Sequence, residues 1–343
     1  MPLFRADGRN PAKKCQPEVK HGLSEPPSPG WQGGSFTVTS VTVNWNGRDV
    51  LLRCLESLSV QDWPLQEIIV VDNHSTDGSV EAVRQACPEA VVLRNDANLG
   101  APKGRNVGLH RALVKPVDFI FTLDNDLFAA PDCVRQLVMA MASDPTVGSV
   151  GAFIYDAQRP DRLLSAGGII DYTQNVSRQL LRVNGADTLH PISYCGTGHM
   201  LTRASLFREI GVLDERFIGY GFEDADFGVR TRAAGYAVCS FGKAKVWHCV
   251  HTGIGVYSFR KKYLETRNAV VFVRRYATGR QWMKYLFFFM SGLVGAMVLQ
   301  IPRGRIGGVI GKCRGFMDGL LDRTQVAERL LGWDSHRMLK KPS

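Results

Sequence analysis

The sequence is poor in the features that mark several large classes of protein. Charged residues make up only 22% of the 343 residues and hydrophobic residues 45%, which is typical of a globular protein and excludes a mostly disordered or multi-pass membrane chain. We find no internal repeat, which excludes a fibrous or repeat architecture. The eight cysteines include no Cys-x-x-Cys pair, which argues against a zinc site and a disulfide framework. The length predicts about two domains.

The N-terminal segment lacks the apolar stretch of a secretory signal peptide. Residues 1–35 are instead rich in Pro, Gly, Lys and Ser, which predicts a disordered leader. Together with the scattered cysteines, this segment indicates a protein of the reducing cytoplasm.

Acidic residues are scarce in the last quarter of the chain. Residues 251–343 contain 17 Lys and Arg against five Asp and Glu, and they include an uncharged apolar stretch at 285–302 with basic residues on both sides. This combination favours a helix that lies in the interface of an anionic membrane. The alternatives are a buried C-terminal helix, for example at a dimer contact, and a transmembrane helix. No nucleic-acid motif accompanies the basic residues, so we expect no nucleic-acid partner.

The first part of the chain alternates between two kinds of pattern. Apolar runs rich in β-branched residues predict strands at 36–45, 67–72, 90–93 and 118–123. Amphipathic patterns predict helices between them at 50–59, 79–86 and 105–114. Such alternation predicts a parallel sheet covered on both faces, with a ligand site beyond the carboxyl ends of the strands. Further on we expect helices at 131–143 and near residue 223, a short strand at 236–240 and a separate segment at 245–248.

Polar residues follow each of the four predicted strands. The pair Asp124 and Asp126, separated by Asn125, can hold a divalent ion that bridges a diphosphate, although a polar turn would look the same. Asp72 ends the second strand, where a carboxylate can accept hydrogen bonds from a nucleobase or ribose. The alternative for Asp72 is a cap for the helix that begins near Ser79.

Ten short motifs, modest singly and specific in their order and spacing, carry a resemblance to a known family. They are Thr42–Gly47, Val70–Gly78, Asn98–Gly100, Gly104–Leu109, Leu123–Asp126, Gly196–Leu201, Gly211–Phe217, Glu223–Asp226, Trp247–His248, and Tyr263 with Arg267–Asn268. The chain resembles glycosyltransferase family 2 over residues 38–275, and within it the rhamnosyltransferase-like branch that builds bacterial surface polysaccharides. The resemblance implies the α/β GT-A fold, in which a Rossmann-like nucleotide-binding sheet is fused to an acceptor-binding subdomain.

The resemblance also implies a nucleotide-diphosphate-sugar donor, a divalent metal, Mg²⁺ or Mn²⁺, and inversion at the anomeric carbon. It assigns nucleotide or substrate binding to several side chains: Asn44, Asn46, Asp72, Asn73, Arg105, Asp124, Asn125 and Glu223. Among these, Asp72 would hold the nucleobase and Asp124 the donor ribose or sugar. It assigns the metal to Asp126 and His248, with His251 as a rival ligand, and the general base to Asp224.

The chemistry of an inverting transfer requires these two kinds of group. A hydroxyl is a poor nucleophile, so a carboxylate must accept its proton, and Asp224 is our candidate. The leaving diphosphate gathers negative charge, which a metal at Asp126 offsets. The plain alternative for Glu223 and Asp224 is that acidic residues stabilise the first turn of a helix.

We therefore expect four regions: a leader at 1–35, a nucleotide-sugar-binding subdomain at 36–130, an acceptor-binding catalytic subdomain at 131–255, and a basic, partly hydrophobic helical membrane-association region at 256–343. The expected function is transfer of rhamnose to a lipid-linked or polysaccharide acceptor at the inner face of the cell membrane. Another donor, such as UDP-galactofuranose or a UDP-hexose, is an alternative. Two further alternatives are a non-catalytic sugar-nucleotide-binding subunit and a nucleotidyltransferase. The sequence lacks the Gly-rich phosphate loop that a nucleotidyltransferase would carry after its first strand.

Overall fold

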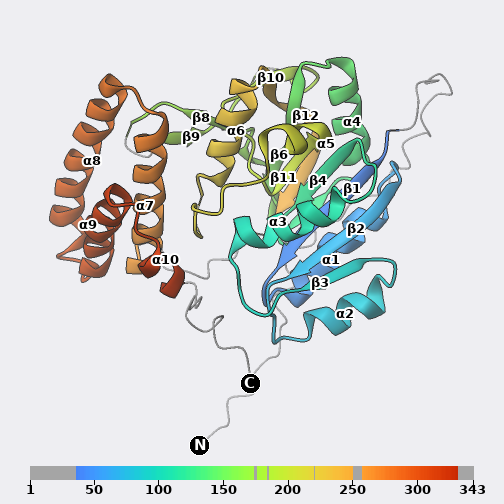
Figure 1. Ribbon diagram of the computed structural model, residues 1–343, viewed down its shortest axis with the longest axis horizontal. Helices are drawn as coiled ribbons and strands as arrows, with labels where there is room; N and C mark the ends of the chain where they lie inside the picture. The colour runs from blue at the N-terminus through green and yellow to red at the C-terminus, as the bar shows by residue number, and fades with distance from the viewer. Residues whose placement is uncertain (1–35, 174–175, 184, 220, 250–256, 331–343) are drawn as a thin grey trace, which may run out of the picture.

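The computed structural model describes residues 36–173, 176–183, 185–219, 221–249 and 257–330 (Figure 1). The predicted leader at 1–35 and the rival metal ligand His251 lie outside the described residues.

The first half of the fold is the predicted strand–helix alternation. Its elements are β1 (Val38–Asn44), α1 (Arg48–Ser59), β2 (Leu65–Asp72), α2 (Ser79–Ala86), β3 (Val91–Arg94), α3 (Ala101–Ala112) and β4 (Phe119–Leu123). β1 runs parallel to both β2 and β4, and β2 runs parallel to β3. The parallel arrangement predicted for these four strands is confirmed. The predicted helix at 105–114 starts four residues later than α3 does. Pro102 lies in the first turn of α3, where a proline is favourable because the N–H that it lacks would have no helical partner.

The second half continues the same sheet with mixed strand directions. It contains β5 (Leu127–Ala129), α4 (Cys133–Ser143), β6 (Val147–Asp156), β7 (Arg159–Ser165), β8 (Gly168–Ile170), β9 (Ser177–Gln179), β10 (Leu189–Pro191), β11 (His199–Arg203), α5 (Ala204–Ile210), α6 (Glu223–Ala233) and β12 (Ala237–His248). The strand order is β10-β12-β6-β11-β4-β1-β2-β3. β11 is antiparallel to its neighbours β4 and β6, whereas β12 is parallel to β6. A purely parallel sheet is therefore a correct description of the first four strands only.

Two segments that we predicted separately form one strand in the structure. β12 is continuous over 12 residues, where we expected a short strand at 236–240 and a separate segment at 245–248. Its pairing with β6 shifts register between Phe241 and Lys245, so the alternation of side chains breaks there. This irregularity is the reason that the period-two pattern did not reveal a single strand.

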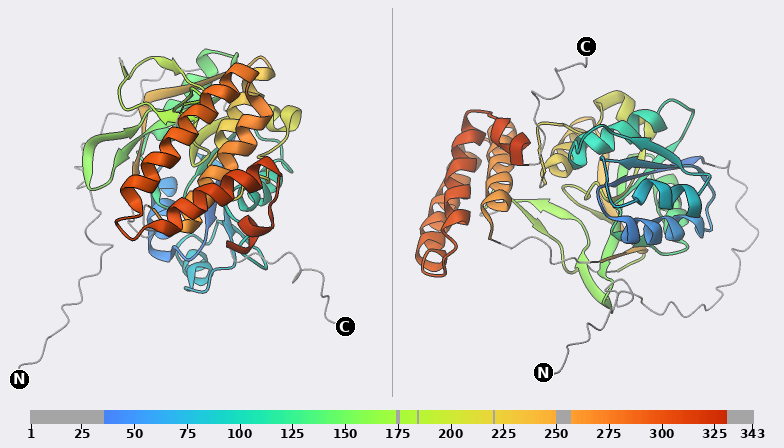
Figure 2. Two further views of the ribbon diagram at one scale, coloured as in Figure 1. Left: turned by 90° about the vertical axis from the view of Figure 1, so that its left-hand side faces the viewer. Right: turned by 90° about the horizontal axis from the view of Figure 1, so that it is seen from below.

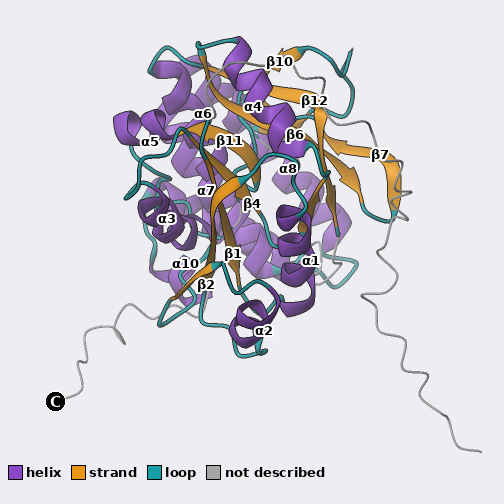
Figure 3. Ribbon diagram, turned by 90° about the vertical axis from the view of Figure 1, so that its right-hand side faces the viewer, coloured by secondary structure: helices purple, strands orange, loops and turns teal. Residues whose placement is uncertain are grey.

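Helices cover both faces of the sheet, as predicted for strands that are apolar throughout. Val70 of β2 packs in the same core as Leu55 of α1 and Leu137 of α4. Its neighbour Val71 faces the other way and shares a second core with Leu109 of α3. Figure 3 shows α1 and α3 on opposite sides of β1 and β4.

Four helices form a C-terminal layer beside the sheet: α7 (Phe259–Tyr276), α8 (Gly279–Gln300), α9 (Ile306–Leu320) and α10 (Gln325–Leu330). Figures 1 and 2 show α7 facing the sheet and α8 on the outer side of the molecule. Glycines let α9 approach α7 closely, since a Cβ at Gly311 would lie 2.6 Å from the carbonyl oxygen of Phe259. The Phe289 ring of α8 stacks on Phe316 of α9 at 4.5 Å between centroids. Of the described helices, only α8 is long and apolar enough to cross a membrane.

Candidate active site

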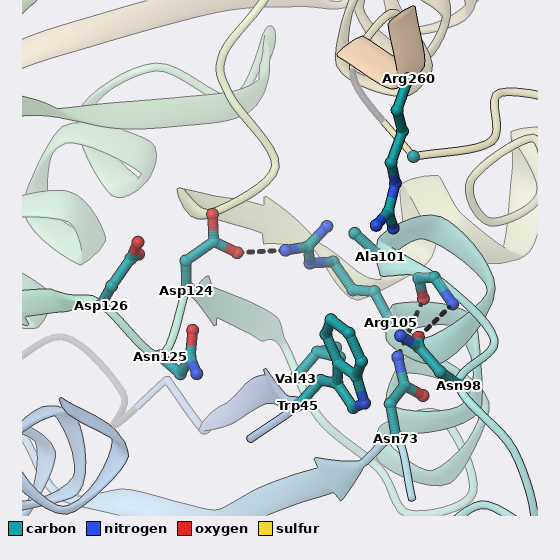
Figure 4. Close-up of a pocket in the computed structure, with 12 residues that line it drawn as sticks. Val43, Trp45, Asn73, Asn98, Ala101, Arg105, Asp124, Asn125, Asp126 and Arg260 are labelled. Carbon is teal, nitrogen blue, oxygen red and sulfur yellow. Dashed lines mark hydrogen bonds and ion pairs between the residues drawn. The ribbon is translucent and has the colours of Figure 1, made fainter. Parts of the chain in front are cut away.

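The carboxyl ends of β1, β2 and β4 open into a cavity of about 400 Å³, the place where ligands bind in such sheets. We call it the nucleotide cavity. Its wall includes Trp45 after β1, Asn73 after β2, Asn98 before α3 and the turn Asp124–Asp126 after β4 (Figure 4). The polar residues that follow the strands therefore gather at one edge of the sheet, as the sequence predicts.

A second cavity of about 340 Å³ adjoins the first, and we call it the transfer cavity. The two share Arg105, Asp124 and Asp126 in their walls. The transfer cavity continues to side chains of the second half of the chain, including Glu223, Asp224, His199 and His248. The Asp-x-Asp turn thus stands where the two halves of the sheet meet.

Arg105 and Asp124 form an ion pair between the two cavities. Arg105 is only 3% exposed, and its guanidinium contacts the Asp124 carboxylate (Figure 4). The guanidinium also donates to Thr197 Oγ1 at 2.9 Å. A guanidinium is rarely buried without a partner, so Asp124 and Thr197 together stabilise its position on α3. The pairing orients the Asp124 carboxylate, and the ion pair as a whole carries no net charge.

Asp126 and His248 meet on the wall of the transfer cavity. The Asp126 Oδ2 and His248 Nε2 atoms are 3.1 Å apart. Burial disfavours the imidazolium, but the hydrogen bond and charge of Asp126, together with the charges of Asp124 and Asp156, outweigh burial and raise the pKa of His248. Carboxylate and imidazole are suitable ligands for a divalent ion, and Mg²⁺ commonly takes only one or two protein side chains plus substrate phosphates. The described residues contain no cluster of three such ligands, and Asp126 and His248 are the pair at this site that could hold an ion together with phosphate oxygens.

Glu223 and Asp224 begin α6 and face the transfer cavity. Asp224 Oδ1 accepts a hydrogen bond from the N–H of Ala225 at 2.7 Å. Glu223 is buried, and its Oε2 has no hydrogen-bond partner among the described residues. Burial raises the pKa of both carboxyl groups, and the repulsion of Asp224 raises that of Glu223 further. A carboxylate with a raised pKa is a better proton acceptor near neutral pH than an ordinary aspartate.

Three of the predicted nucleotide-binding residues hold loops together and do not line the nucleotide cavity. Asp72 is 1% exposed, and its Oδ2 accepts from the N–H of Ser75 at 2.9 Å. Asn44 donates to Ser75 Oγ at 3.2 Å, and Asn46 Oδ1 accepts from the N–H of Thr76 at 2.8 Å. These bonds join the loop after β1 to the loop after β2.

Asn73 and Asn125 do line the nucleotide cavity. Asn125 Nδ2 donates to Asn44 Oδ1 at 2.8 Å, which ties the turn after β4 to the end of β1. Trp45 lines the wall beside them and is 48% exposed. An exposed aromatic ring beside amide groups is suited to a nucleobase, which stacks and accepts hydrogen bonds.

Two titratable residues of the cavity walls, His199 and Arg260, were not assigned from sequence. His199 of β11 is buried, its Nδ1 lies 2.9 Å from the carbonyl oxygen of Ala152, and burial lowers its pKa to about 4, so the ring is neutral. Arg260 of α7 lines the nucleotide cavity. Only the glycine-rich motif around His199 gave any signal, and nothing near Arg260 distinguishes it from the other basic residues of the tail.

A cavity at the carboxyl ends of parallel strands, joined through an Asp-x-Asp turn to a mixed sheet, is the arrangement expected of a glycosyltransferase that uses a nucleotide-sugar donor, and the comparisons with known proteins show this class. Residues 39–211 match the sequence model of Glycosyl transferase family 2, and the chain belongs to this family. Residues 186–252 also match the model described as the N-terminal domain of galactosyltransferase.

Relatives of known name support the same class. The chain is 26% identical over 229 residues to the N-acetylglucosaminyl-diphospho-decaprenol L-rhamnosyltransferase of Mycobacterium tuberculosis, which covers 61% of this chain and 74% of the relative. It is 26% identical over 189 residues to the galactofuranosyltransferase GlfT1 of Mycolicibacterium smegmatis, covering 54% of this chain and 62% of that one. Within the family, the chain is thus similar to a rhamnosyltransferase, as the sequence motifs indicate, and at the same identity to a galactofuranosyltransferase.

A solved structure confirms the fold. GalNAc-T7, crystallised with UDP, GalNAc and Mn²⁺, superposes with a TM-score of 0.61 at 17% identity. The match covers 87% of this chain and 58% of GalNAc-T7. At this identity the likeness shows the GT-A fold, which was the fold expected from the sequence.

Proposed function

We propose that this glycosyltransferase is a metal-dependent inverting enzyme that moves rhamnose from a nucleoside-diphosphate donor to a lipid-linked or polysaccharide acceptor. The observation that carries the proposal is the transfer cavity, which brings the candidate base Asp224 and the candidate metal ligands Asp126 and His248 into one wall. The acceptor class rests on the mycobacterial rhamnosyltransferase, whose name specifies a diphospho-decaprenol acceptor.

In this proposal Asp224 accepts the proton of the acceptor hydroxyl as the new bond to the anomeric carbon forms. The bond from that carbon to the diphosphate oxygen breaks in the same step, so the configuration inverts. Asp124 orients the donor, held in place by Arg105. Asp126 and His248 would hold the divalent ion, which supplies positive charge to the leaving diphosphate when bound.

The test is a transfer reaction with dTDP-rhamnose and a synthetic acceptor that carries N-acetylglucosamine on a polyprenyl diphosphate. We expect a disaccharide-lipid product whose new linkage has the anomeric configuration opposite to that of the donor, as read by NMR. A product with retained configuration, or no product in a preparation that binds the donor, would contradict the proposal.

A second donor, UDP-galactofuranose, is favoured by two observations. The chain is related to a galactofuranosyltransferase, and residues 186–252 match a galactosyltransferase model. Comparing the rates of transfer from UDP-galactofuranose and dTDP-rhamnose separates the two candidates. Rhamnose is a 6-deoxyhexopyranose and differs from galactofuranose in ring size and hydroxyl pattern, so a sugar pocket distinguishes them by several contacts.

We also propose that α8 associates peripherally with the cytoplasmic face of the cell membrane. One side of α8 packs within the protein through Tyr285, Phe289, Leu293 and Ala296. The other side exposes large apolar side chains at helical spacing: Met283, Phe287, Met290, Val294 and Val298. Basic residues stand at its two ends, at 280 and 284 and at 303 and 305, where anionic headgroups would attract them.

The alternative of a helix buried within the chain does not fit the structure, because only 17% of the apolar window of α8 is buried. A dimer contact through the same side and a transmembrane helix are the remaining alternatives. The division of the chain at residues 130 and 255 stays a proposal, in which 36–130 bind the nucleotide sugar, 131–255 the acceptor, and 256–343 the membrane.

A further inference from the structure

Arg260 is a basic residue of the C-terminal layer that reaches the nucleotide cavity. It is the second residue of α7, and its side chain lines the cavity together with Arg105 and Asp124. Figure 4 shows its guanidinium extending from α7 toward Ala101 and Arg105. A side chain from the region expected to contact the membrane therefore takes part in the wall of the donor site.

The guanidinium of Arg260 differs from the other charged groups of the cavity wall. Arg105 pairs with Asp124, and His248 pairs with Asp126. Arg260 forms no ion pair with a carboxylate in the described part of the chain, and its Nε is buried without a hydrogen-bond partner there. A buried N–H without an acceptor costs free energy, which an anionic ligand with several oxygens would recover.

The position toward which Arg260 points also favours an anion. Ala101 is the first residue of α3, and both Ala101 and the preceding Gly100 line the nucleotide cavity. The N-terminal end of a helix carries partial positive charge and N–H groups without helical partners, which suit phosphate groups. Arg260 and the start of α3 are thus two independent sources of positive potential in the nucleotide cavity.

We propose that Arg260 binds the diphosphate of the nucleotide donor, an inference that rests on the proposed function. The guanidinium forms paired hydrogen bonds with phosphate oxygens, which a point charge such as lysine does not reproduce. The diphosphate is the part of the donor that gains negative charge as the sugar leaves, so Arg260 stabilises the leaving group as well as the bound donor.

The anchoring of α7 explains how Arg260 keeps its place. Asn268 lies two turns further along α7 and is completely buried. Its Nδ2 donates to the carbonyl oxygen of Ile218 at 3.0 Å and to that of Gly221 at 3.2 Å. These carbonyls belong to the loop that leads into Glu223 and Asp224, so α7 is fixed to the segment that carries the candidate base.

The test measures binding by calorimetry for dTDP, UDP and the corresponding nucleosides, with Mn²⁺ present. Arg260→Ala should weaken binding of the diphosphates about tenfold or more, the usual value of a charge-assisted hydrogen bond, and leave nucleoside binding within about twofold. Arg260→Lys should fall between the wild type and the alanine variant. Arg260→Gln keeps most of the side-chain volume and serves if the alanine variant folds poorly.

Lys261→Ala is the matched control. It removes one positive charge from the next position of the same helix, where Lys261 Nζ faces Glu265 at 3.9 Å. Its diphosphate affinity should equal that of the wild type.

Three results would overturn the inference, and they are distinguishable. Unchanged diphosphate binding in Arg260→Ala and Arg260→Gln refutes the contact while the proposed function stands. An equal loss for nucleosides and diphosphates shows that Arg260 shapes the base pocket instead. Absence of diphosphate binding by the wild-type protein contradicts the proposed function itself.

Discussion

Two apolar helices of this protein have different surroundings. α4 carries Val134, Leu137 and Met141, all of which are completely buried against the sheet. α8 is also apolar, yet Phe287 is 68% and Val298 66% exposed. The amino-acid composition does not distinguish the two helices, but the burial of their side chains does. The comparison teaches that the sheet region uses its apolar residues to build a core, whereas the C-terminal layer leaves part of its apolar residues exposed, as the membrane proposal requires.

The sheet region should be the seat of catalysis, so the largest effect is expected there. Asp224→Asn removes the proton acceptor without changing its size, and transfer should fall by about 10²–10⁴-fold. Donor binding, measured by calorimetry, should stay within a few-fold. Asp49→Asn, an exposed acidic position on α1, is the control and should keep full activity. A near-wild-type rate in Asp224→Asn would exclude Asp224 as the base.

The acidic limb of the pH–rate profile should report the same group. Asp224 acts only when ionised, and burial raises its pKa. Activity should therefore rise with increasing pH through a value above that of an ordinary aspartate, and fall as the pH is lowered through it. A kcat/KM profile that stays flat down to the pKa of an exposed aspartate would contradict this environment.

Core truncation sharpens the contrast between α4 and α8. Leu137→Ala in α4 should lower the free energy of unfolding by about 2–5 kcal/mol, because it opens a cavity in a closed core. Val294→Ala in α8 should change it by less than about 0.5 kcal/mol, because its side chain is exposed. Urea denaturation of the two variants measures both values. Equal losses would show that α8 is as closely packed as α4 in solution.

The membrane proposal predicts a loss at α8 that leaves folding intact. Phe287→Ser combined with Val294→Ser should reduce binding to vesicles of phosphatidylglycerol and phosphatidylcholine by more than about tenfold, since both side chains would leave the apolar phase. Val60→Ser with Val114→Ser changes similarly exposed apolar residues of the sheet region and should have no effect. If the α8 variant dissociates a dimer while vesicle binding persists, α8 is a dimer contact.

The smallest expected effect concerns the metal. Asp126→Ala should reduce Mn²⁺-dependent donor binding about tenfold, the loss of one charged ligand contact, and leave binding in the presence of chelator unchanged. Titration calorimetry with and without EDTA separates the two. Identical behaviour of the variant and the wild type would exclude Asp126 as a metal ligand.

Much of the fold was readable from sequence for a local reason. Strands rich in β-branched residues and helices with a clear apolar face alternate through residues 36–143, and each pattern is complete within a short window. The second half was harder, because β11 enters the sheet antiparallel and β12 shifts register at Phe241. These features depend on pairing between distant segments.

Some residues of the candidate site were predicted from the sequence, and others were not. Asp124, Asp126 and Asp224 follow strand ends or begin a helix, and the structure places all three in the wall of one cavity. Asp72 follows the same pattern, but its carboxylate closes a turn, because a buried carboxylate satisfies nearby N–H groups first. Arg260 could not be found, since only the packing of α7 brings it to the nucleotide cavity.

The most direct test of the account is calorimetric binding of dTDP-rhamnose, UDP-galactofuranose and UDP-hexoses to the wild-type protein, with Mn²⁺ and with chelator. The account predicts that binding depends on metal and that dTDP-rhamnose is preferred. Absence of binding to every nucleotide sugar in a well-folded preparation would contradict it and favour a non-catalytic role for the chain.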